Sequence, residues 1–449
     1  MTVSTSTPPD SPTAREQSLR VRLIPYVDRY GVWLLVILMM VVMTILQPDV
    51  FFSWRNLTNI GKQNVLNGLL ALGMFVVIVT AGIDLSVGST LAMGMIVLAV
   101  VVIGDPKRGI EPSPWYIGIG LPLIVGLFAG LINGRVFTKT QPGLILLLGA
   151  VVLTLLFGQP WYVMLGAAIL IFFAYRMLIA EDAQQRIYLI LTLVFGALFS
   201  GFLYVSRQSL LNIGIVASLS IVGLVLFFAQ RSGLKDLKLP HPFIATLGTQ
   251  FILRGLTNIL SGGVPYSGLP DQVRLLGARD FFTGQVLGEG RDFPIAIIVV
   301  LVCYFVMWVF LEHTRTGRHI YAIGGNPQAA RVSGINVDNV LTLVYTLCGF
   351  FAGLAALLLA GRTNSGFPNA GLGSELDAIS AVIIGGASFF GGRGSVWGTL
   401  AGVLVIGLLR NALNLLGVQV FWQQVLIGVV IIVAVGLDTV RRKAGSTGG

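Results

Sequence analysis

The chain has 449 residues, of which 55% are hydrophobic and 11% charged, and its mean hydropathy is +0.87. So few charges cannot build a water-facing surface, which excludes a soluble globular protein. Continuous apolar runs of helical length favour a bundle of transmembrane helices over a β-barrel, whose strands would alternate apolar and polar residues. The net charge of +10 is attributed to basic residues at membrane boundaries rather than to nucleic-acid binding. Both cysteines, Cys303 and Cys348, lie in apolar segments, and neither suggests a disulfide or a metal site.

The polar N-terminal segment is predicted to be a disordered cytoplasmic tail. Residues 1–30 have Ser, Thr and Pro clustered near the start, which is not typical of a cleavable signal. The first apolar run, residues 31–46, is therefore expected to stay as a membrane anchor, and a second span is expected at about residues 65–81. An amphipathic interfacial connection is predicted between them, containing Trp54, Arg55 and Lys62.

A short polar break precedes a third span, which is predicted to run from residue 87 to just before Gly104. The break contains Asp84, and a carboxylate inside a membrane is costly unless it is paired or hydrated. One interpretation is structural: Asp84 caps the following helix while Ser86 and Ser89 satisfy freed backbone groups. The other is functional: Asp84 lines a translocation path and contacts a hydroxylated solute.

The middle of the chain carries an unusual number of apolar runs. A fourth span, residues 117–136, contains Asn133 near its end. Four further apolar segments follow, of which the first two are short for complete spans. They are residues 143–157, 161–175, 187–205 and 210–228. Because their number is even, they leave the orientation of all later segments unchanged.

The next span, residues 243–260, contains Arg254, which is expected to snorkel near the end of the helix. The polar stretch 261–292 is long enough to form a small external cap or docking surface. A span at residues 294–311 then returns to the cytoplasmic side.

The best-defined hydrophilic interval of the second half is the stretch Thr314–Asn339. It has three arginines and one acid, Asp338, so the positive-inside tendency places it in the cytoplasm. Within it, Asn326 is a good N-cap, Pro327 suits the first helical position, and Gly334 ends the short helix. Two interpretations stay open on these grounds: a docking helix parallel to the membrane, or an ordinary solvated loop.

A second external segment is predicted after the next span. Residues 341–360 leave the cytoplasm, and residues 362–377 follow outside. The acids Glu375 and Asp377 stand directly before the apolar run 378–384, where a helix dipole favours negative charge in the first turn. The functional alternative for these acids is a gate or a contact with the solute.

A glycine-rich turn, residues 385–395, invites a phosphate-loop interpretation, but no Lys-Ser or Lys-Thr follows it. Its glycines are expected to permit tight helix packing or a re-entrant break. The last two spans are predicted at residues 397–409 and 420–435, with the polar stretch 410–414 between them. The basic segment 441–443 then places the C-terminus inside.

Four stretches of the sequence match a known pattern. They are GMFVVIVTAGIDLSVGS (Gly73–Ser89), FIATLGTQFILRGL (Phe243–Leu256), GRHIYAIGGNPQAARVSGINV (Gly317–Val337) and SELDAISAVIIGGASFFGGRGSVWGTLAG (Ser374–Gly402). Together they resemble the permease subunits of bacterial binding-protein-dependent sugar ABC importers, of the ribose, xylose and multiple-monosaccharide type. The resemblance covers nearly the whole chain except the middle segment between Thr138 and Lys238, where this sequence departs from the pattern.

The resemblance implies an all-α polytopic bundle of ten spans, here with about four inserted spans. It also implies a multi-pass protein of the inner membrane with both termini in the cytoplasm, paired with a second permease copy, ABC-type ATPase subunits and a periplasmic sugar-binding protein. The chain itself is expected to bind no ATP, metal or cofactor and to be no enzyme. The expected division is 1–30 tail, 31–138 first part of the permease core, 139–238 inserted segments, 239–440 second part of the core with the coupling loop 314–339, and 441–449 basic tail.

The resemblance further implies that the coupling loop seats in a groove of the ATPase. The residues that match this loop are Gly324, Gly325, Asn326, Pro327, Ala329, Ala330, Arg331 and Gly334. A weakly polar lining is expected for the path of xylose or a related pentose or hexose, because the binding protein supplies selectivity. Its candidate residues are Asp84, Ser86, Asn133 and Glu375.

The alternative function is a secondary transporter or channel that works alone on a small polar solute. Such a protein would need a carboxylate or His deep within a span as an ion or proton site. Here Asp84 and Glu375 lie at segment breaks, and the three His residues fall at span boundaries.

Overall fold

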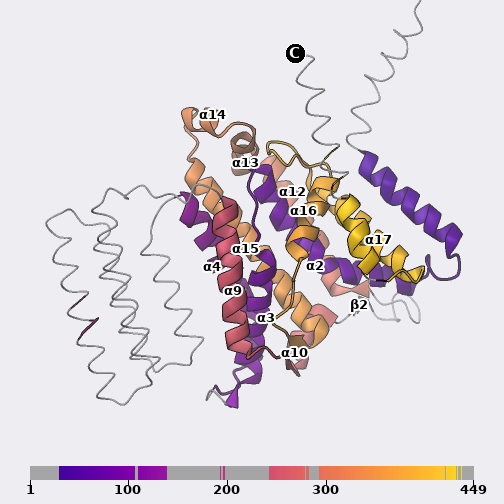
Figure 1. Cartoon of the computed structure of the whole chain (residues 1–449), viewed down its shortest axis with the longest axis horizontal. Coiled ribbons are helices and arrows are strands. Elements are labelled where there is room, and N and C mark those ends of the chain that lie inside the picture. The colour runs from indigo at the N-terminus through magenta and orange to yellow at the C-terminus, as the bar shows by residue number, and fades with distance from the viewer. Residues whose placement is uncertain are drawn as a thin grey trace, which may run out of the picture.

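A computed structural model describes the two parts of the chain on either side of the middle segment (Figure 1). The described residues are 30–106, 110–138, 242–278, 280–282, 293–419 and 421–430, with the isolated residues 193, 196, 197, 432 and 436. The four predicted apolar segments between residues 143 and 228 therefore lie outside the described residues, apart from three single positions.

The described residues form a helical bundle, as the composition predicts. A first helix, Tyr30–Leu46, precedes the labelled elements. In chain order these are α2 (Trp54–Val79), α3 (Val87–Ile103), α4 (Trp115–Thr138), α9 (Pro242–Ser261), β1 (Tyr266–Ser267), α10 (Asp271–Ala278), β2 (Asp280–Phe282), β3 (Phe293–Pro294), α12 (Ile295–His313), α13 (Arg315–Gly325), α14 (Pro327–Val332), α15 (Val337–Thr363), β4 (Ser365–Gly366), α16 (Ser374–Ile384) and α17 (Val396–Leu415). A last described helix is Phe421–Val430.

Six of these helices are long and apolar enough to cross a membrane: α2, α4, α9, α12, α15 and α17. Three shorter apolar helices accompany them, namely Tyr30–Leu46, α3 and Phe421–Val430. The strands form two small antiparallel pairs, β1 with β4 and β2 with β3. The all-α polytopic class is thus confirmed, while the count of ten spans plus four stays a prediction.

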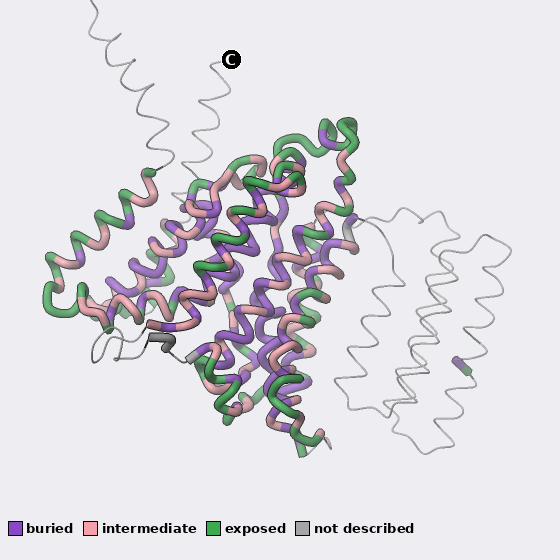
Figure 2. Tube along the Cα trace, turned by 180° about the vertical axis from the view of Figure 1, so that it is seen from behind, coloured by how far each residue is buried: buried purple, intermediate pink, exposed green. Residues whose placement is uncertain are grey.

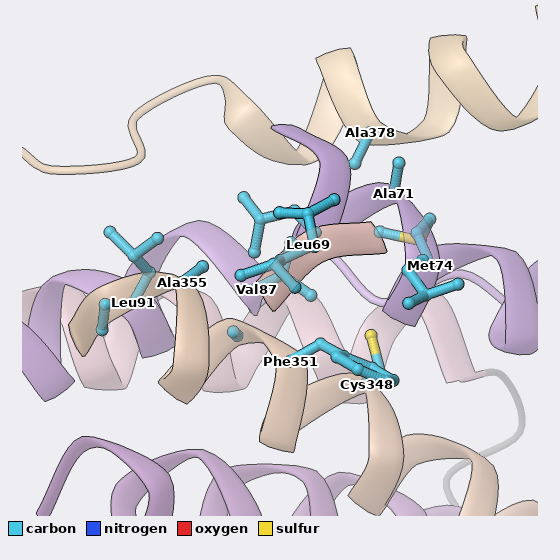
Figure 3. Packing of buried hydrophobic residues seen from close by; sticks show 14 of the residues in the cluster. Leu69, Ala71, Met74, Val87, Leu91, Cys348, Phe351, Ala355 and Ala378 are labelled. Atoms are coloured by element: carbon cyan, nitrogen blue, oxygen red, sulfur yellow. The ribbon is translucent and has the colours of Figure 1, made fainter. Parts of the chain in front are cut away.

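The centre of the bundle is α15, which packs against α2, α3, α4 and α10. Buried apolar side chains from α2, α3, α15 and α16 meet there in one cluster, part of which Figure 3 shows around Leu69, Met74 and Phe351. Figure 2 shows the buried residues concentrated along the inner helices, with exposed residues on the outer faces and at the ends. Outer apolar faces suit a protein whose surroundings are lipid.

Helices α4 and α15 approach each other through glycines. A Cβ at Gly126 would overlap the carbonyl oxygen of Gly349, and a Cβ at Gly349 would overlap that of Gly126. In a membrane, where lipid is as apolar as the helices, such close backbone contact is a main source of helix association. The glycines inside the spans therefore set the helix spacing.

Two predicted span boundaries are wrong, because both helices are longer than their apolar runs. Helix α2 begins at Trp54 rather than near residue 65, so Trp54, Arg55 and Lys62 belong to the helix and form no separate connection. Helix α17 continues to Leu415 through the stretch predicted as a polar connection. Hydropathy alone ends a span at its polar residues, whereas here Asn56, Asn411 and Arg410 are paired across helices.

The pairs that allow this extension are specific. Asn56 on α2 and Asn411 on α17 exchange two side-chain hydrogen bonds, with N···O distances of 3.2 and 2.8 Å. Arg410 on α17 forms an ion pair of 2.8 Å with Asp377 on α16. A polar group costs little inside a bundle when a neighbouring helix satisfies it.

The glycine-rich turn has both features expected of it. Helix α16 has 11 residues, fewer than the roughly 20 that a span needs. The turn after it contains Gly386, Gly391, Gly392 and Gly394 at positive φ, and Gly385 packs directly on Gly398 of α17. This segment breaks the helical path and permits tight packing at the same time.

Arg254 of α9 is anchored to the segment before α16, and its expected snorkelling stays a prediction. Its Nη1 atom donates hydrogen bonds to the backbone carbonyls of Pro368 at 2.6 Å and Ala370 at 2.9 Å. The guanidinium thus faces the turn before α16, whose carbonyl oxygens accept its hydrogen bonds.

Candidate functional site

The two ends of the bundle differ, and α13 and α14 form one of them, opposite α10 (Figure 1). The sequence predicts the short helix correctly: the Asn326 side chain accepts hydrogen bonds from the backbone of Gln328 and Ala329, both at 3.0 Å, and Pro327 opens α14. Gly334 follows the helix with a φ of 82°. An Asn cap followed by Pro is a strong signal for the start of a helix. The Asn side chain accepts hydrogen bonds from free backbone N–H groups of the first turn, and Pro has no N–H that would need a partner.

Helix α13 was not predicted from the sequence. It begins after Thr314, whose side chain accepts a hydrogen bond from the backbone of Gly317 at 3.1 Å. Ile320 and Ile323 are three residues apart and both buried. This spacing is the signal of an amphipathic helix, but the terminal glycine pair makes the stretch resemble a loop.

Helix α14 is firmly attached to the bundle on one side and open on the other. Ala330 is buried with Ile323 of α13 and Val337 of α15. The exposed Arg331 forms an ion pair of 2.8 Å with Asp338. The outer face carries Val332, which is 90% exposed. An ordered helix that presents an open face is suited to contact another protein.

The glycine pair before α14 lies where three segments meet. A Cβ at Gly324 would overlap the carbonyl oxygen of Val79 at the end of α2 and would lie 2.5 Å from the backbone nitrogen of Gly392. Gly392 donates its backbone N–H to that same Val79 oxygen at 2.8 Å. We call the contact among Gly324, Val79 and Gly392 the glycine junction. It joins the base of α14 to the last residue of α2.

Tyr321 of α13 adds a side-chain contact beside the glycine junction. Its hydroxyl donates a hydrogen bond to the carbonyl oxygen of Gly394 at 3.3 Å. Burial, with the charge of Glu312 as a smaller cause, raises the pKa of Tyr321 to about 12. The phenol is therefore protonated at neutral pH and serves as a donor.

The break between α2 and α3 holds three of the four candidate path residues together. The Asp84 carboxylate accepts hydrogen bonds from the backbone N–H of Ser86 at 2.9 Å and from its hydroxyl at 2.7 Å. From α4, the Asn133 amide donates to the Ser86 hydroxyl at 2.8 Å and to the Asp84 carboxylate at 3.3 and 3.4 Å. We call Asp84, Ser86 and Asn133 the polar knot.

The structural interpretation of Asp84 is wrong in its detail. The N-cap of α3 is Ser86, whose side chain makes no capping hydrogen bond. Asp84 stands two residues earlier and binds the N–H of the cap residue itself, because the chain turns before the helix starts. Asp84 is 1% exposed, so its burial is made tolerable by the polar knot rather than by water.

No hydrogen bond among the described residues joins Glu375 to the polar knot. It is 6% exposed and stands in the first turn of α16, as does Asp377. Its Oε1 atom accepts a hydrogen bond from the Gln250 side chain on α9 at 3.2 Å. The sequence located both acids correctly, but it did not indicate the partners Gln250 and Arg410, which come from helices far along the chain.

Comparison with known proteins shows the family to which the chain belongs. Residues 144–435 match the family model described as a permease component of branched-chain amino acid transport systems. The chain is 32% identical to the ribose import permease of Bacillus subtilis over 425 residues, covering 95% of this chain and 96% of the relative. It is 32% identical to the ribose import permease of Escherichia coli K12 over 409 residues, covering 91% and 92%.

The name of a third relative refers to another pentose, xylose. The chain is 31% identical to the xylose transport system permease of Haemophilus influenzae over 402 residues, covering 88% of this chain and 91% of the relative. No solved structure gives a significant match. The family match begins inside the segment 139–238, whose interpretation as an insertion stays a prediction.

Proposed function

Because the chain belongs to this permease family and is a sugar importer permease of the ABC type, we propose that it forms the path by which a monosaccharide enters a bacterial cell. Such a permease is a non-enzymatic, multi-pass component of the inner membrane. The named relatives transport ribose and xylose. A pentose is accordingly our first choice of solute, and a hexose the second.

The energy for import comes from other chains in this proposal. Two ABC-type ATPase subunits dock on the cytoplasmic side, to which we assign α14, and a periplasmic binding protein delivers the sugar to the opposite side. A second copy of this chain completes the path. ATP binding draws the paired docking helices together, and the rigid helices open a central path to the other side.

The single observation that carries this proposal is the geometry of α14. It is a capped, attached and outward-facing helix, joined through the glycine junction to the end of α2. We assign the contact with the ATPase to it and to its flanking residues. They are Gly324, Gly325, Asn326, Pro327, Ala329, Ala330, Arg331 and Gly334.

For the solute, we propose two sets of polar contacts. The polar knot of Asp84, Ser86 and Asn133 lies at the break that follows α2. We expect a movement of α14 to reach this break through the glycine junction. Glu375 forms the second set at the start of α16. Hydroxyl, amide and carboxylate groups are suitable partners for sugar hydroxyls.

A transport assay tests the proposal. The permease is reconstituted in proteoliposomes with its candidate ATPase, with and without the binding protein, and uptake of labelled ribose, xylose, allose and galactose is measured. We expect uptake of at least one sugar that requires both ATP and the binding protein. Uptake without ATP would contradict the proposal and favour an independent secondary transporter.

One variant addresses the docking helix directly. A Cβ at Gly325 would meet no atom within 4 Å, so we expect Gly325→Trp to fold and to obstruct a docking partner. We expect it to lose co-purification with the ATPase and to lose uptake. Gly325→Ala is the matched control and is expected to behave like the wild type. If Gly325→Trp kept the ATPase bound, the docking assignment would be wrong.

A further inference from the structure

Two charged side chains beside α16 each have one atom that is buried without a hydrogen-bond partner among the described residues. These atoms are Nη2 of Arg254 and Oε2 of Glu375. A buried charged group that lacks a partner destabilises a protein, most of all inside a membrane. The hydrogen bonds among the described residues therefore leave one polar atom of each group unsatisfied.

The other polar atoms of these side chains are anchored. Nη1 of Arg254 is held by the carbonyls of Pro368 and Ala370, and Oε1 of Glu375 is held by Gln250. Gln250 and Arg254 are four residues apart on α9, so they lie on one face of the helix. The two unpartnered atoms thus belong to side chains that are already oriented by hydrogen bonds.

The two charges lie near each other but do not neutralise each other by contact. Arg254 and Glu375 interact electrostatically, yet they form no ion pair within 4.0 Å. The carboxylate also approaches the start of α3, where a Cβ at Gly88 would lie 2.5 Å from Oε2. A donor and an acceptor are therefore held close together, separated by more than the length of an ion pair.

We propose that Arg254 and Glu375 bind two neighbouring hydroxyl groups of the monosaccharide during its passage. Nη2 of Arg254 donates to one sugar oxygen, and Oε2 of Glu375 accepts from the adjacent hydroxyl. A sugar hydroxyl both donates and accepts, so a vicinal diol matches one donor beside one acceptor. Gln250 positions the carboxylate. This inference rests on the proposed import of a sugar and names the group that the site recognises.

The surface around the buried pair is exposed on both α16 and α9. Leu372 and Leu376, on either side of Glu375 in the chain, are 70% and 57% exposed. On α9, the side chain of Phe251 is also exposed, and a Cβ at Gly248 or Gly255 would meet no atom within 4 Å. Because Nη2 and Oε2 are buried in this state, the sugar reaches the pair when α9 and α16 move apart during the transport cycle.

The test compares the number of sugar molecules imported per ATP hydrolysed, at saturating loaded binding protein, in the full complex. Glu375→Gln keeps the size of the side chain but removes the charge, and Arg254→Lys keeps the charge but lacks the planar fork that reaches the two backbone carbonyls and the sugar oxygen in separate directions. We expect each to lower this ratio about tenfold while ATP hydrolysis continues, because a hydroxyl loses its partner. Asp377→Asn is the matched control: it weakens the ion pair with Arg410 and lowers the yield of complex, but leaves the ratio unchanged.

The outcomes separate this inference from the proposed function. If the wild type imports no sugar, the proposed function fails. If the wild type imports sugar and both variants keep the ratio within about twofold, the function stands and the diol site is wrong. If Glu375→Gln does not assemble, Arg254→Lys decides alone. A parallel fall of ATP hydrolysis and uptake in both variants would indicate a purely structural role and also overturn the site.

Discussion

Polar side chains join spans that are far apart in the sequence. Asn56 and Asn411 are 355 positions apart, yet each amide donates to the other. Asn56 also donates to the carbonyl oxygen of Phe51 at 2.9 Å, whereas the Asn411 side chain bonds with Asn56 alone among the described residues. The two asparagines are therefore unequal partners, which leads to an asymmetric prediction.

We expect Asn56→Ala to destabilise the protein more than Asn411→Ala. The first change removes all three bonds and leaves the Asn411 amide buried without its partner, while the second leaves Asn56 with Phe51. The expected cost is about 1–2 kcal/mol for Asn56→Ala and less for Asn411→Ala. Reversible unfolding in detergent measures both values.

The double variant checks the interpretation. Because both single changes break the same bonds, the cost of the double variant should be smaller than the sum of the two. Fully additive costs would mean that the two amides do not interact in the folded protein.

At the scale of elements, α14 shows how local signals can specify a structure without help from the rest of the chain. Its Asn cap, its first-turn Pro and its terminating Gly334 are all within the stretch that they organise. Local capping groups act over three or four residues, so the sequence reveals them directly.

The cap of α14 yields a second prediction. Asn326→Ala removes the acceptor for Gln328 and Ala329 and should loosen the start of the helix by about 1 kcal/mol. Because the docking contact needs an ordered α14, we expect weaker binding of the ATPase subunits, measured by titration onto the purified permease.

The matched control for the cap is Asn326→Asp. Its carboxylate accepts the same two hydrogen bonds, so it should bind the ATPase as the wild type does. If both variants bound equally weakly, the Asn326 amide would contact the ATPase itself and the capping argument would not apply.

At the scale of the whole molecule, the glycine junction connects the docking end to the interior. Gly324 of α13 contacts the end of α2, and the break that follows α2 contains the polar knot. A movement of α14 therefore has a direct mechanical route to Asp84. The bundle needs glycine at this position because any side chain would separate the three segments.

Neighbouring glycines provide the test. Gly324→Ala places a methyl group onto the Val79 oxygen and should destabilise the protein by about 1–3 kcal/mol. It should also lower sugar import per ATP, since α14 and α2 no longer move together. Gly325→Ala, with open space around it, should change neither thermal stability nor the import ratio. Equal behaviour of the two variants would show that the junction transmits nothing.

The sequence by itself determined the class of the protein and much of its local structure. Apolar composition excludes a soluble fold, apolar runs locate the main spans, and short-range capping signals identify α14. The four motifs also indicated the family, and the order and spacing of the last three fit its pattern. Each of these features depends on residues that are close together in the chain.

Only the tertiary structure decided where polar residues belong. Helices α2 and α17 extend past their apolar runs because Asn56, Asn411 and Arg410 find partners on other helices. In the same way, Asp84 accepts a hydrogen bond from Asn133 of α4, and Glu375 accepts one from Gln250 of α9. Inside a membrane a polar side chain is tolerated according to its neighbours in space. Those neighbours lie tens to hundreds of residues away in the sequence.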